Sequence, residues 1–191
     1  AKFDNLSAAR ALLEEKANVN AITAHRESPL HVASGIGKKD PNVLRLLIHH
    51  PQSNIHVRDA NTQSLLHVAS RSGSTQALAV ILDTLDMERE RSGKKARKGR
   101  QMIHSFDRWG RSPLHWAVLN GHKECVKLLL DAKASPLLAM SSAATKKRTH
   151  LTQESSAELA IRVHGKESDM IRLLRKVTRT DLAKAKNRSV Q

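Results

Sequence analysis

Three histidines occupy the same place in a phrase that the sequence repeats. SPLHVA spans residues 28–33, SLLHVA spans 64–69 and SPLHWA spans 112–117, which gives His31, His67 and His115. Imidazole is a common zinc ligand, but zinc holds its ligands about 2 Å away. Helices that carry successive copies of a phrase pack roughly 8–10 Å apart. One ion therefore cannot bridge the copies, and we expect each histidine to be neutral and to hydrogen-bond between neighbouring copies.

The other reactive side chains do not form a catalytic pattern. The single cysteine, Cys125, lies in an apolar helical stripe, where a buried structural thiol is expected. His49 and His50 close a helix and complement its dipole. GKKD at 37–40 lacks the spacing of a phosphate-binding loop, and G-x-S-x-G does not occur. We predict a protein that is not an enzyme, with no catalytic residue, cofactor, metal or small-molecule substrate.

Each copy of the phrase is expected to begin a pair of helices. A degenerate fourth copy, SSAELA, spans residues 155–160. The serine at its head can cap a first helix, and the leucines Leu30, Leu66 and Leu114 enter the core. A break with glycine follows, at Gly37, Gly73, Gly121 and the His164-Gly165 pair. Second helices are then predicted over 43–48, 78–83, 125–131 and 170–176. Each pair has an apolar face that only a neighbouring pair can cover.

The phrase, the Gly-His break, the paired leucines and the exit segments at 16–21 and 133–138 together resemble the ankyrin repeat, whose period is about 33 residues. The resemblance covers roughly residues 6–177. It implies an all-α fold, an ankyrin-repeat solenoid of stacked helix-turn-helix pairs with short hairpin loops. Lys16 and Lys133 stand where glycine is typical after a helix, so those turns should cost slightly more free energy.

The repeat boundaries predict the organisation of the chain. An array over residues 1–177 comprises a partial first repeat at 1–27 and repeats near 28–63, 64–111, 112–154 and 155–177. Basic insertions interrupt it at 86–104 and 140–153, and a basic tail follows at 178–191. The chain does not begin with Met, and we expect it to be a piece of a longer protein.

Positive charge is the strongest compositional signal. Lys and Arg number 33 against 18 Asp and Glu, a formal net charge of +15. Such an excess attracts anionic partners, either an acidic protein surface or RNA. No apolar run approaches the roughly 18 residues that a membrane span needs, so membrane insertion is not expected. One cysteine is compatible with a reducing compartment, and we favour the nucleus or cytoplasm while an organelle stays open.

Two basic insertions are the candidate anion or nucleic-acid contacts. KKARKGR at 94–100 could act as a nuclear localisation patch, a phosphate-contacting loop or a solvated run. It contains no aromatic residue, so it does not offer base stacking. Together with 146–148 and 172–188 it could form one basic stripe or three scattered patches. The candidate residues are Lys94, Lys95, Arg97, Lys98, Arg100, Lys146, Lys147 and Arg148.

The resemblance implies a second candidate surface, the concave face formed by hairpin tips and exposed first-helix positions. Trp109 lies between two arginines, a composition typical of binding hot spots, although it could instead fold back on its neighbours. Trp116, within the repeated phrase, is expected in the core. The candidate protein-binding residues are Arg108, Trp109, Arg111, Asn61, Gln63, Arg71, Leu119 and Asn120.

Two functions follow as hypotheses. The first is a non-catalytic interaction module or scaffold that binds a partner through its concave face, with basic insertions contacting an anionic surface. The second is an RNA-contacting subunit of a ribonucleoprotein assembly such as a ribosome. Phosphate contacts weaken steeply with salt, whereas a tryptophan-centred protein contact weakens little, and salt dependence therefore separates the two.

Overall fold

The structure is a computed structural model that describes residues 5–36, 41–92, 101–138, 154–165 and 168–176. The described residues contain helices and turns but no β-strand. Residues 101–103 and 169–176 are also helical. The labelled helices are α1 (Asn5–Glu14), α2 (Pro29–Ile36), α3 (Asn42–Ile48), α4 (Leu65–Ser72), α5 (Thr75–Ser92), α7 (Pro113–Leu119), α8 (Lys123–Asp131) and α9 (Ser156–His164).

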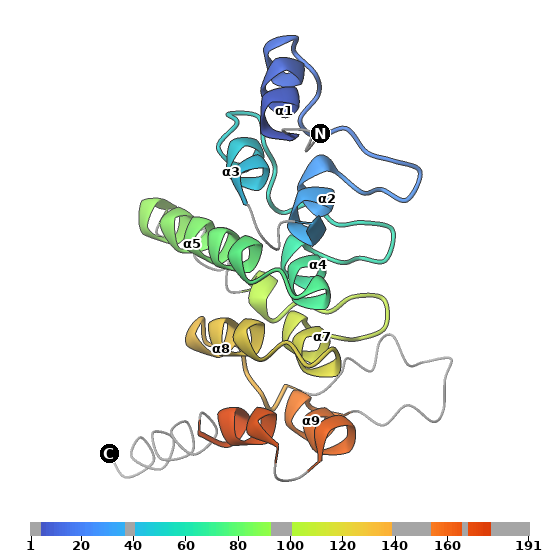
Figure 1. Ribbon diagram of the computed structural model, residues 1–191, viewed down its shortest axis with the longest axis vertical. Coiled ribbons are helices and arrows are strands. Elements are labelled where there is room, and N and C mark those ends of the chain that lie inside the picture. The colour runs from blue at the N-terminus through green and yellow to red at the C-terminus, as the bar shows by residue number, and fades with distance from the viewer. Residues whose placement is uncertain (1–4, 37–40, 93–100, 139–153, 166–167, 177–191) are drawn as a thin grey trace.

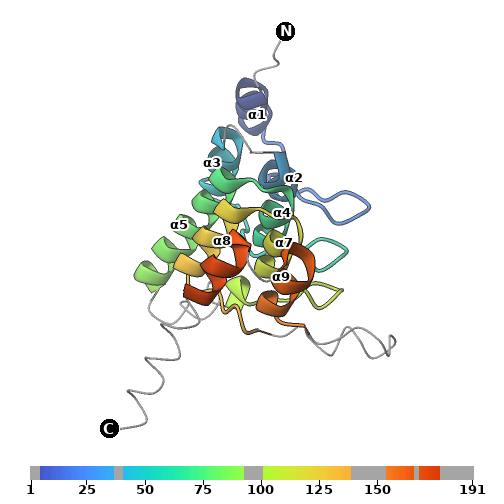
Figure 2. The same ribbon diagram turned by 60° about the horizontal axis from the view of Figure 1, so that its bottom comes forward.

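The helices stack in two parallel rows (Figures 1 and 2). The first helices α2, α4, α7 and α9 form one row, and each packs on the next. The second helices α1, α3, α5, α8 and 169–176 form the other row. Hairpin loops leave the row of first helices on the side away from the second helices (Figure 1). This is the all-α solenoid of helix pairs that the repeats predict.

Serine caps begin the first helices, as the phrase predicts. Ser112 precedes α7, and its side chain accepts a hydrogen bond from the backbone N–H of His115. Ser64 before α4 and Ser155 before α9 form the same reciprocal capping arrangement. Each cap satisfies backbone donors that the first helical turn leaves unpaired. The repeated serine thus sets the start of each layer.

The core runs unbroken through the stack and is built from the repeated leucines and alanines. Leu30, Leu66 and Leu114 are almost completely buried, and Ala117 is fully buried between its two helices. Cys125 is buried in the same cluster, which confirms its structural placement. Small residues at the alanine positions let helix backbones approach closely, so each layer packs tightly on the next.

The three phrase histidines bridge neighbouring repeats, as predicted. The Nε2 atoms of His31, His67 and His115 lie 3.2, 3.0 and 3.1 Å from the backbone carbonyl oxygens of Gln63, Arg111 and Glu154 respectively. Each ring also accepts at Nδ1 from the backbone N–H of its capping serine. Burial lowers the pKa of all three, and that of His67 falls to about 4. Neutral rings can donate at one nitrogen and accept at the other, which this arrangement requires.

A second histidine series joins the layers at the breaks between helices. The Nε2 atom of His122 lies 3.2 Å from the carbonyl oxygen of Arg71, and that of His164 lies 2.6 Å from the carbonyl oxygen of Val118. Gly73 adopts a φ of +71°, and its Cα faces the His122 ring closely enough that a Cβ would lie 2.7 Å from it. The predicted break at Gly37 lies outside the described residues.

The exit turns carry lysine in a left-handed conformation, as their position in the repeat predicts. Lys16 has a φ of 61° and Lys133 a φ of 69°. Side chains with a Cβ adopt this region at a cost of about 1 kcal/mol relative to glycine. Both turns therefore store a small backbone strain.

The predicted insertion at 86–104 is helical at its start and buried near its end. Helix α5 continues through the charge-rich segment 86–91 to Ser92. Met102 and Ile103, which follow later in the chain, are buried in the core. Met102 and Ile103, which lie within the predicted insertion, therefore belong to the packed core. Residues 93–100 lie outside the described residues.

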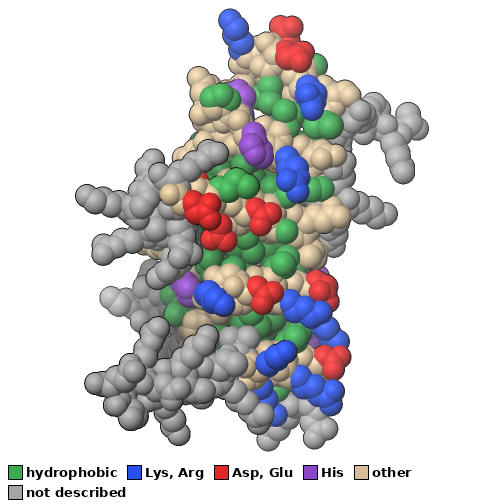
Figure 3. All heavy atoms as spheres, turned by 90° about the vertical axis from the view of Figure 1, so that its left-hand side faces the viewer, with side chains coloured by type: hydrophobic (Ala, Val, Ile, Leu, Met, Phe, Trp, Pro, Cys, Tyr) green, Lys and Arg blue, Asp and Glu red, His purple; other side chains and the backbone are tan. Residues whose placement is uncertain are grey.

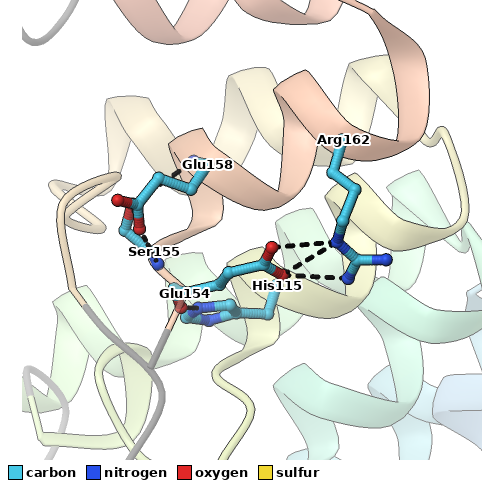
Figure 4. Close-up of polar contacts among 5 residues, drawn as sticks. All are labelled: His115, Glu154, Ser155, Glu158 and Arg162. Atoms are coloured by element: carbon cyan, nitrogen blue, oxygen red, sulfur yellow. Dashed lines mark hydrogen bonds and ion pairs between the residues drawn. The ribbon is translucent and has the colours of Figure 1, made fainter. Parts of the chain in front are cut away.

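The last layer joins the stack at Glu154 (Figure 4). Its backbone oxygen lies 3.1 Å from His115 Nε2, while its carboxylate accepts hydrogen bonds from Arg162 at 2.9 to 3.1 Å. Ser155 and Glu158 cap the N-terminus of α9 through reciprocal hydrogen bonds, and these hydrogen bonds lower the pKa of Glu158. One residue thus contacts the preceding layer through its backbone and its own layer through its side chain.

Candidate protein-binding surface

Each hairpin tip is closed by a polar turn. In the second and third tips, residues 59–63 and 107–111, an aspartate begins the turn. Asp59 Oδ1 accepts from the backbone N–H groups of Asn61 and Gln63 at 2.8 Å. Asp107 Oδ1 accepts from the N–H groups of the two equivalent residues at 3.0 and 2.9 Å. The carboxylates therefore hold both tips in one conformation.

The tips are also joined to one another along the stack. The N–H of Ala60 donates to the carbonyl oxygen of His25 at 2.9 Å, and the N–H of Arg108 donates to that of Asn61 at the same distance. Arg108 also donates from Nη1 to Asn61 Oδ1 at 3.2 Å. The candidate residues Arg108 and Asn61 therefore lie together, from tips 47 residues apart in sequence. The tips form a continuous edge of what we call the inner surface, the surface between the tips and the row of first helices.

Trp116 lies on this inner surface, and its expected place in the core is wrong. The side chain is half-buried, and its indole Nε1 donates to Asp107 Oδ2 at 2.7 Å. The equivalent residues in the two preceding copies are Val32 and Val68. Val32 is 49% exposed and Val68 is 8% exposed, so this position of the phrase faces the surface in the first copy. In the third copy the indole ring extends toward the hairpin. A comparison of the three copies of the phrase could have predicted the surface position of Trp116.

Two tryptophans and three arginines gather here into a set that we call the Trp–Arg cluster. Trp109 and Trp116 meet edge to face, with ring centroids 6.0 Å apart and an interplanar angle of 81°. The Arg111 guanidinium lies 4.8 Å and that of Arg71 lies 5.9 Å from the centroid of Trp116. Arg108 lies 5.5 Å from the centroid of Trp109. Three predicted residues, Trp109, Arg71 and Arg111, thus contact Trp116, and a fourth, Arg108, contacts Trp109.

Trp109 combines the two alternatives that the sequence leaves open. Its ring contacts Trp116 and Arg108, yet 37% of the residue stays exposed. A rigid indole that is supported on one side and open on the other can contact a partner at a low cost in side-chain entropy.

Gln63 is predicted to contact a partner, and this prediction is wrong. It is fully buried, and its Nε2 donates to Asp107 Oδ2 at 3.2 Å. Its backbone oxygen lies 3.2 Å from the imidazole Nε2 of His31. Gln63 therefore links two repeats and the third hairpin, and a partner cannot reach it. The sequence does not predict this role, because Gln63 stands among exposed turn residues and is buried only by the next layer of the stack.

The remaining predicted residues lie on or beyond this surface. Leu119 is half-buried, and Asn120 is exposed while its Nδ2 donates to the carbonyl oxygen of Trp116 at 2.9 Å. All of the predicted anion contacts lie outside the described residues: Lys94, Lys95, Arg97, Lys98, Arg100, Lys146, Lys147 and Arg148. Most of the excess positive charge of the chain belongs to segments outside the described residues.

The face formed by the second helices has a different character. Figure 3 shows acidic and basic side chains interspersed over its described part. Lys127 pairs with Glu124 at 2.8 Å, and Lys123 pairs with Asp169 at the same distance. By contrast, no described carboxylate lies within ion-pair distance of the three arginines of the Trp–Arg cluster. The inner surface therefore carries three arginines that contact tryptophan rings and have no carboxylate partner among the described residues.

Neither a metal site nor a membrane span is found in the described chain. Over the described ranges, no group of three or more His, Cys, Asp or Glu side chains is placed to hold a metal ion. Within the same residues no helix is long and apolar enough to cross a bilayer.

The stacked helix pairs, the bonded hairpin tips and the inter-repeat histidines define a repeat solenoid. A family model for ankyrin repeats, three copies, matches residues 36–140 and 94–179, and the chain belongs to the ankyrin-repeat family. Ankyrin repeats generally mediate protein–protein interaction and are generally not enzymes.

Several long proteins contain similar segments. Rabankyrin-5 of Mus musculus is 29% identical over 153 residues, which cover 80% of this chain and 12% of that protein. Transient receptor potential cation channel subfamily A member 1 of Homo sapiens is 24% identical over 127 residues, 66% of this chain and 10% of the channel subunit. The probable E3 ubiquitin-protein ligase XBOS32 of Oryza sativa subsp. japonica is 33% identical over 103 residues, 46% of this chain and 21% of the ligase. The chain thus spans a small part of the length of these relatives.

Proposed function

We propose that this chain is a non-catalytic protein-binding module whose main contact surface is the inner surface around Trp109. The observation that carries the proposal is the Trp–Arg cluster, in which three guanidinium groups lie against two indole rings. Arg71, Arg108 and Arg111 have no carboxylate partner among the described residues. Tryptophan and arginine are the side chains most enriched at binding hot spots. The partner surface should be acidic, since it must complement these cations.

The basic insertions extend this proposal. The runs at 94–100 and 146–148 contact the same anionic partner, and they mainly raise the association rate. Reversing Lys94, Lys95, Arg97 and Lys98 to Glu should weaken binding strongly at low salt and little at high salt. Equal binding by this variant and the parent at low salt contradicts a role for the first insertion.

Affinity purification with the parent chain and two variants tests the function. Trp109→Ala removes the exposed ring, and Lys127→Ala, on the face of the second helices, serves as the matched control. Proteins retained by the parent and by the control but lost with Trp109→Ala support the proposal. Proteins retained equally by all three chains contradict it.

RNA contact is the second candidate, and the net charge of +15 is the observation that favours it. A nuclease treatment separates the two candidates within the same experiment. Retention that is lost with nuclease but indifferent to Trp109→Ala assigns the chain to a ribonucleoprotein. Such binding would also fall steeply with salt, because each phosphate contact releases counterions.

A further inference from the structure

The inner surface changes character along the stack. Val32 and Ile36 lie one turn apart on α2 and are 49% and 65% exposed. In the α7 copy of the phrase the equivalent residues are Trp116 and Asn120, and those of α4 are Val68 and Ser72. The α2 end of the surface is therefore apolar, whereas its α7 end is aromatic and cationic.

The cationic end presents the guanidinium groups of two arginines beside one indole ring. Arg71 comes from α4 and Arg111 from the hairpin before α7, and both guanidiniums lie over the ring of Trp116. The indole N–H is already used by Asp107, so it does not compete for a ligand. No described hydrogen-bond acceptor engages the side chain of either arginine. A stacked guanidinium keeps its N–H edges for a planar anion, which is how arginine recognises carboxylates.

We infer that the inner surface receives an extended segment of a partner protein that places a carboxylate side chain against the guanidinium groups beside Trp116 and an apolar side chain against Val32 and Ile36. This inference rests on the proposed function and adds the order of the recognised residues. The segment runs along the stack, with its acidic residue over the α4–α7 junction and its apolar residue over α2.

The geometry of the stack sets the spacing of the two recognised residues. Neighbouring first helices pack roughly 8–10 Å apart. An extended chain advances about 3.3 Å per residue. Passing from α2 to α4 therefore takes about three residues, and passing from α2 to α7 takes about six. The acidic and apolar residues of the partner should be separated by about three to six positions.

The same surface favours a polypeptide over RNA. Exposed Val32 and Ile36 offer apolar contact area that a sugar-phosphate backbone does not complement. The ring of Trp116 carries guanidiniums at 4.8 and 5.9 Å, and Trp109 contacts that ring edge to face. Stacking of a base would have to displace these groups.

Selection from a random-peptide phage library tests the inference. The parent chain, an Arg71→Gln/Arg111→Gln variant, a Val32→Ser/Ile36→Ser variant and the Trp109→Ala variant are used in parallel. Arg10→Gln on α1, in the other row of helices, controls for loss of positive charge. Thermal melting followed by circular dichroism confirms that each variant folds. These substitutions remove surface side chains. The contact of His67 with Arg111 uses the backbone oxygen of Arg111, which the substitution keeps.

The parent and Arg10→Gln should enrich peptides with an acidic and an apolar residue about three to six positions apart. Synthetic copies of these peptides should bind the double arginine variant about tenfold or more weakly, because two charge-assisted contacts are lost. Peptides enriched on that variant should lose the acidic preference and keep the apolar one. Peptides enriched on the Val32→Ser/Ile36→Ser variant should show the opposite change.

Different results overturn the inference and the proposed function. Peptides that bind the parent in a Trp109-dependent way, but without an acidic preference or without the spacing, overturn only the inference. Absence of any Trp109-dependent peptide overturns both. Binding of fluorescein-labelled oligouridine that Arg71→Gln/Arg111→Gln abolishes assigns the arginines to RNA and also overturns the inference.

Discussion

The indole Nε1 of Trp116 donates a 2.7 Å hydrogen bond to the Oδ2 atom of Asp107, nine residues earlier in the chain. This contact ties helix α7 to the hairpin that precedes it. The other oxygen of the same carboxylate shapes the hairpin turn, so one side chain fixes both the tip and the ring beneath it. The Trp–Arg cluster is thereby held in place before any partner arrives.

Asp107 should matter more to stability than its counterpart Asp59. The Asp107 carboxylate accepts from two backbone N–H groups, from Gln63 and from Trp116, whereas that of Asp59 accepts from two backbone N–H groups. Asp107→Ala leaves more buried donors without acceptors and should lower the free energy of unfolding by about 2–4 kcal/mol, against about 1–2 kcal/mol for Asp59→Ala. Urea titration measures both values. Equal losses would show that the contacts to Gln63 and Trp116 contribute nothing.

Gly73→Ala should destabilise the protein more than Gly121→Ala. Both glycines have a φ of +71°, so alanine strains either backbone by about 1 kcal/mol. At Gly73 the new Cβ would also lie 2.7 Å from the imidazole ring of His122, whereas at Gly121 its nearest neighbour, in the His164 ring, lies 3.4 Å away. The His122 ring must shift and weaken its bond to Arg71, so we expect about 1–2 kcal/mol of further loss. Chemical denaturation of the two variants provides the comparison, and identical losses contradict the role given to His122.

Leu114→Ala should lower the free energy of unfolding by about 2–5 kcal/mol, the range for a buried leucine whose cavity does not fully close. Leu114 is 1% exposed in the centre of the stack. Leu137→Ala is the matched control, since that leucine is 57% exposed and should change stability by less than about 0.5 kcal/mol. A loss below about 1 kcal/mol for Leu114→Ala would mean that the layer is loosely packed.

Stability should fall as the pH is lowered from 6.5 toward 4. His67 has a pKa of about 4 in the folded protein and 6.5 as its ordinary value, because burial disfavours its charged form. The unfolded chain therefore takes up the proton first, and the stability present above pH 6.5 is lost progressively down to about pH 4. His67 alone contributes about 3 kcal/mol to this loss, and His31 and His115 add to it in the same direction.

Urea midpoints measured from pH 7.5 to 4.5 test this linkage. His67→Gln lowers stability at neutral pH but removes one titrating group, so its stability should depend less on pH than that of the parent. His25→Gln, at an exposed hairpin tip, is the control and should keep the parent's slope. The assignment to His67 fails when the parent and His67→Gln show the same slope.

Most of the fold can be predicted from the repeated phrase alone. Serine at its head, leucine in its middle and alanine at its end are local requirements for a cap, a core contact and a close helix approach. The histidine bridges were also predictable, because a repeated polar residue in a packed layer must find its partner in the next layer. These features depend on short-range chemistry that recurs in every copy.

Other features were decided by contacts between segments far apart in the sequence. Gln63 looks like an exposed turn residue, yet the third hairpin covers it and takes its hydrogen bond. Trp116 looks like a core residue, yet its ring leaves the layer for Asp107 and becomes the support for Arg71 and Arg111. Met102 and Ile103 look like part of an insertion, yet they pack into the core.

The sequence by itself therefore determined the class of fold. Only the tertiary structure decided which residues meet and which remain accessible. The physical reason is that caps and packing within a layer depend on neighbours in sequence, whereas burial of a surface position depends on the layer that stacks on it. The exact juxtaposition of Arg71 with Trp116 needs two repeats in register, and their register is set by the whole stack.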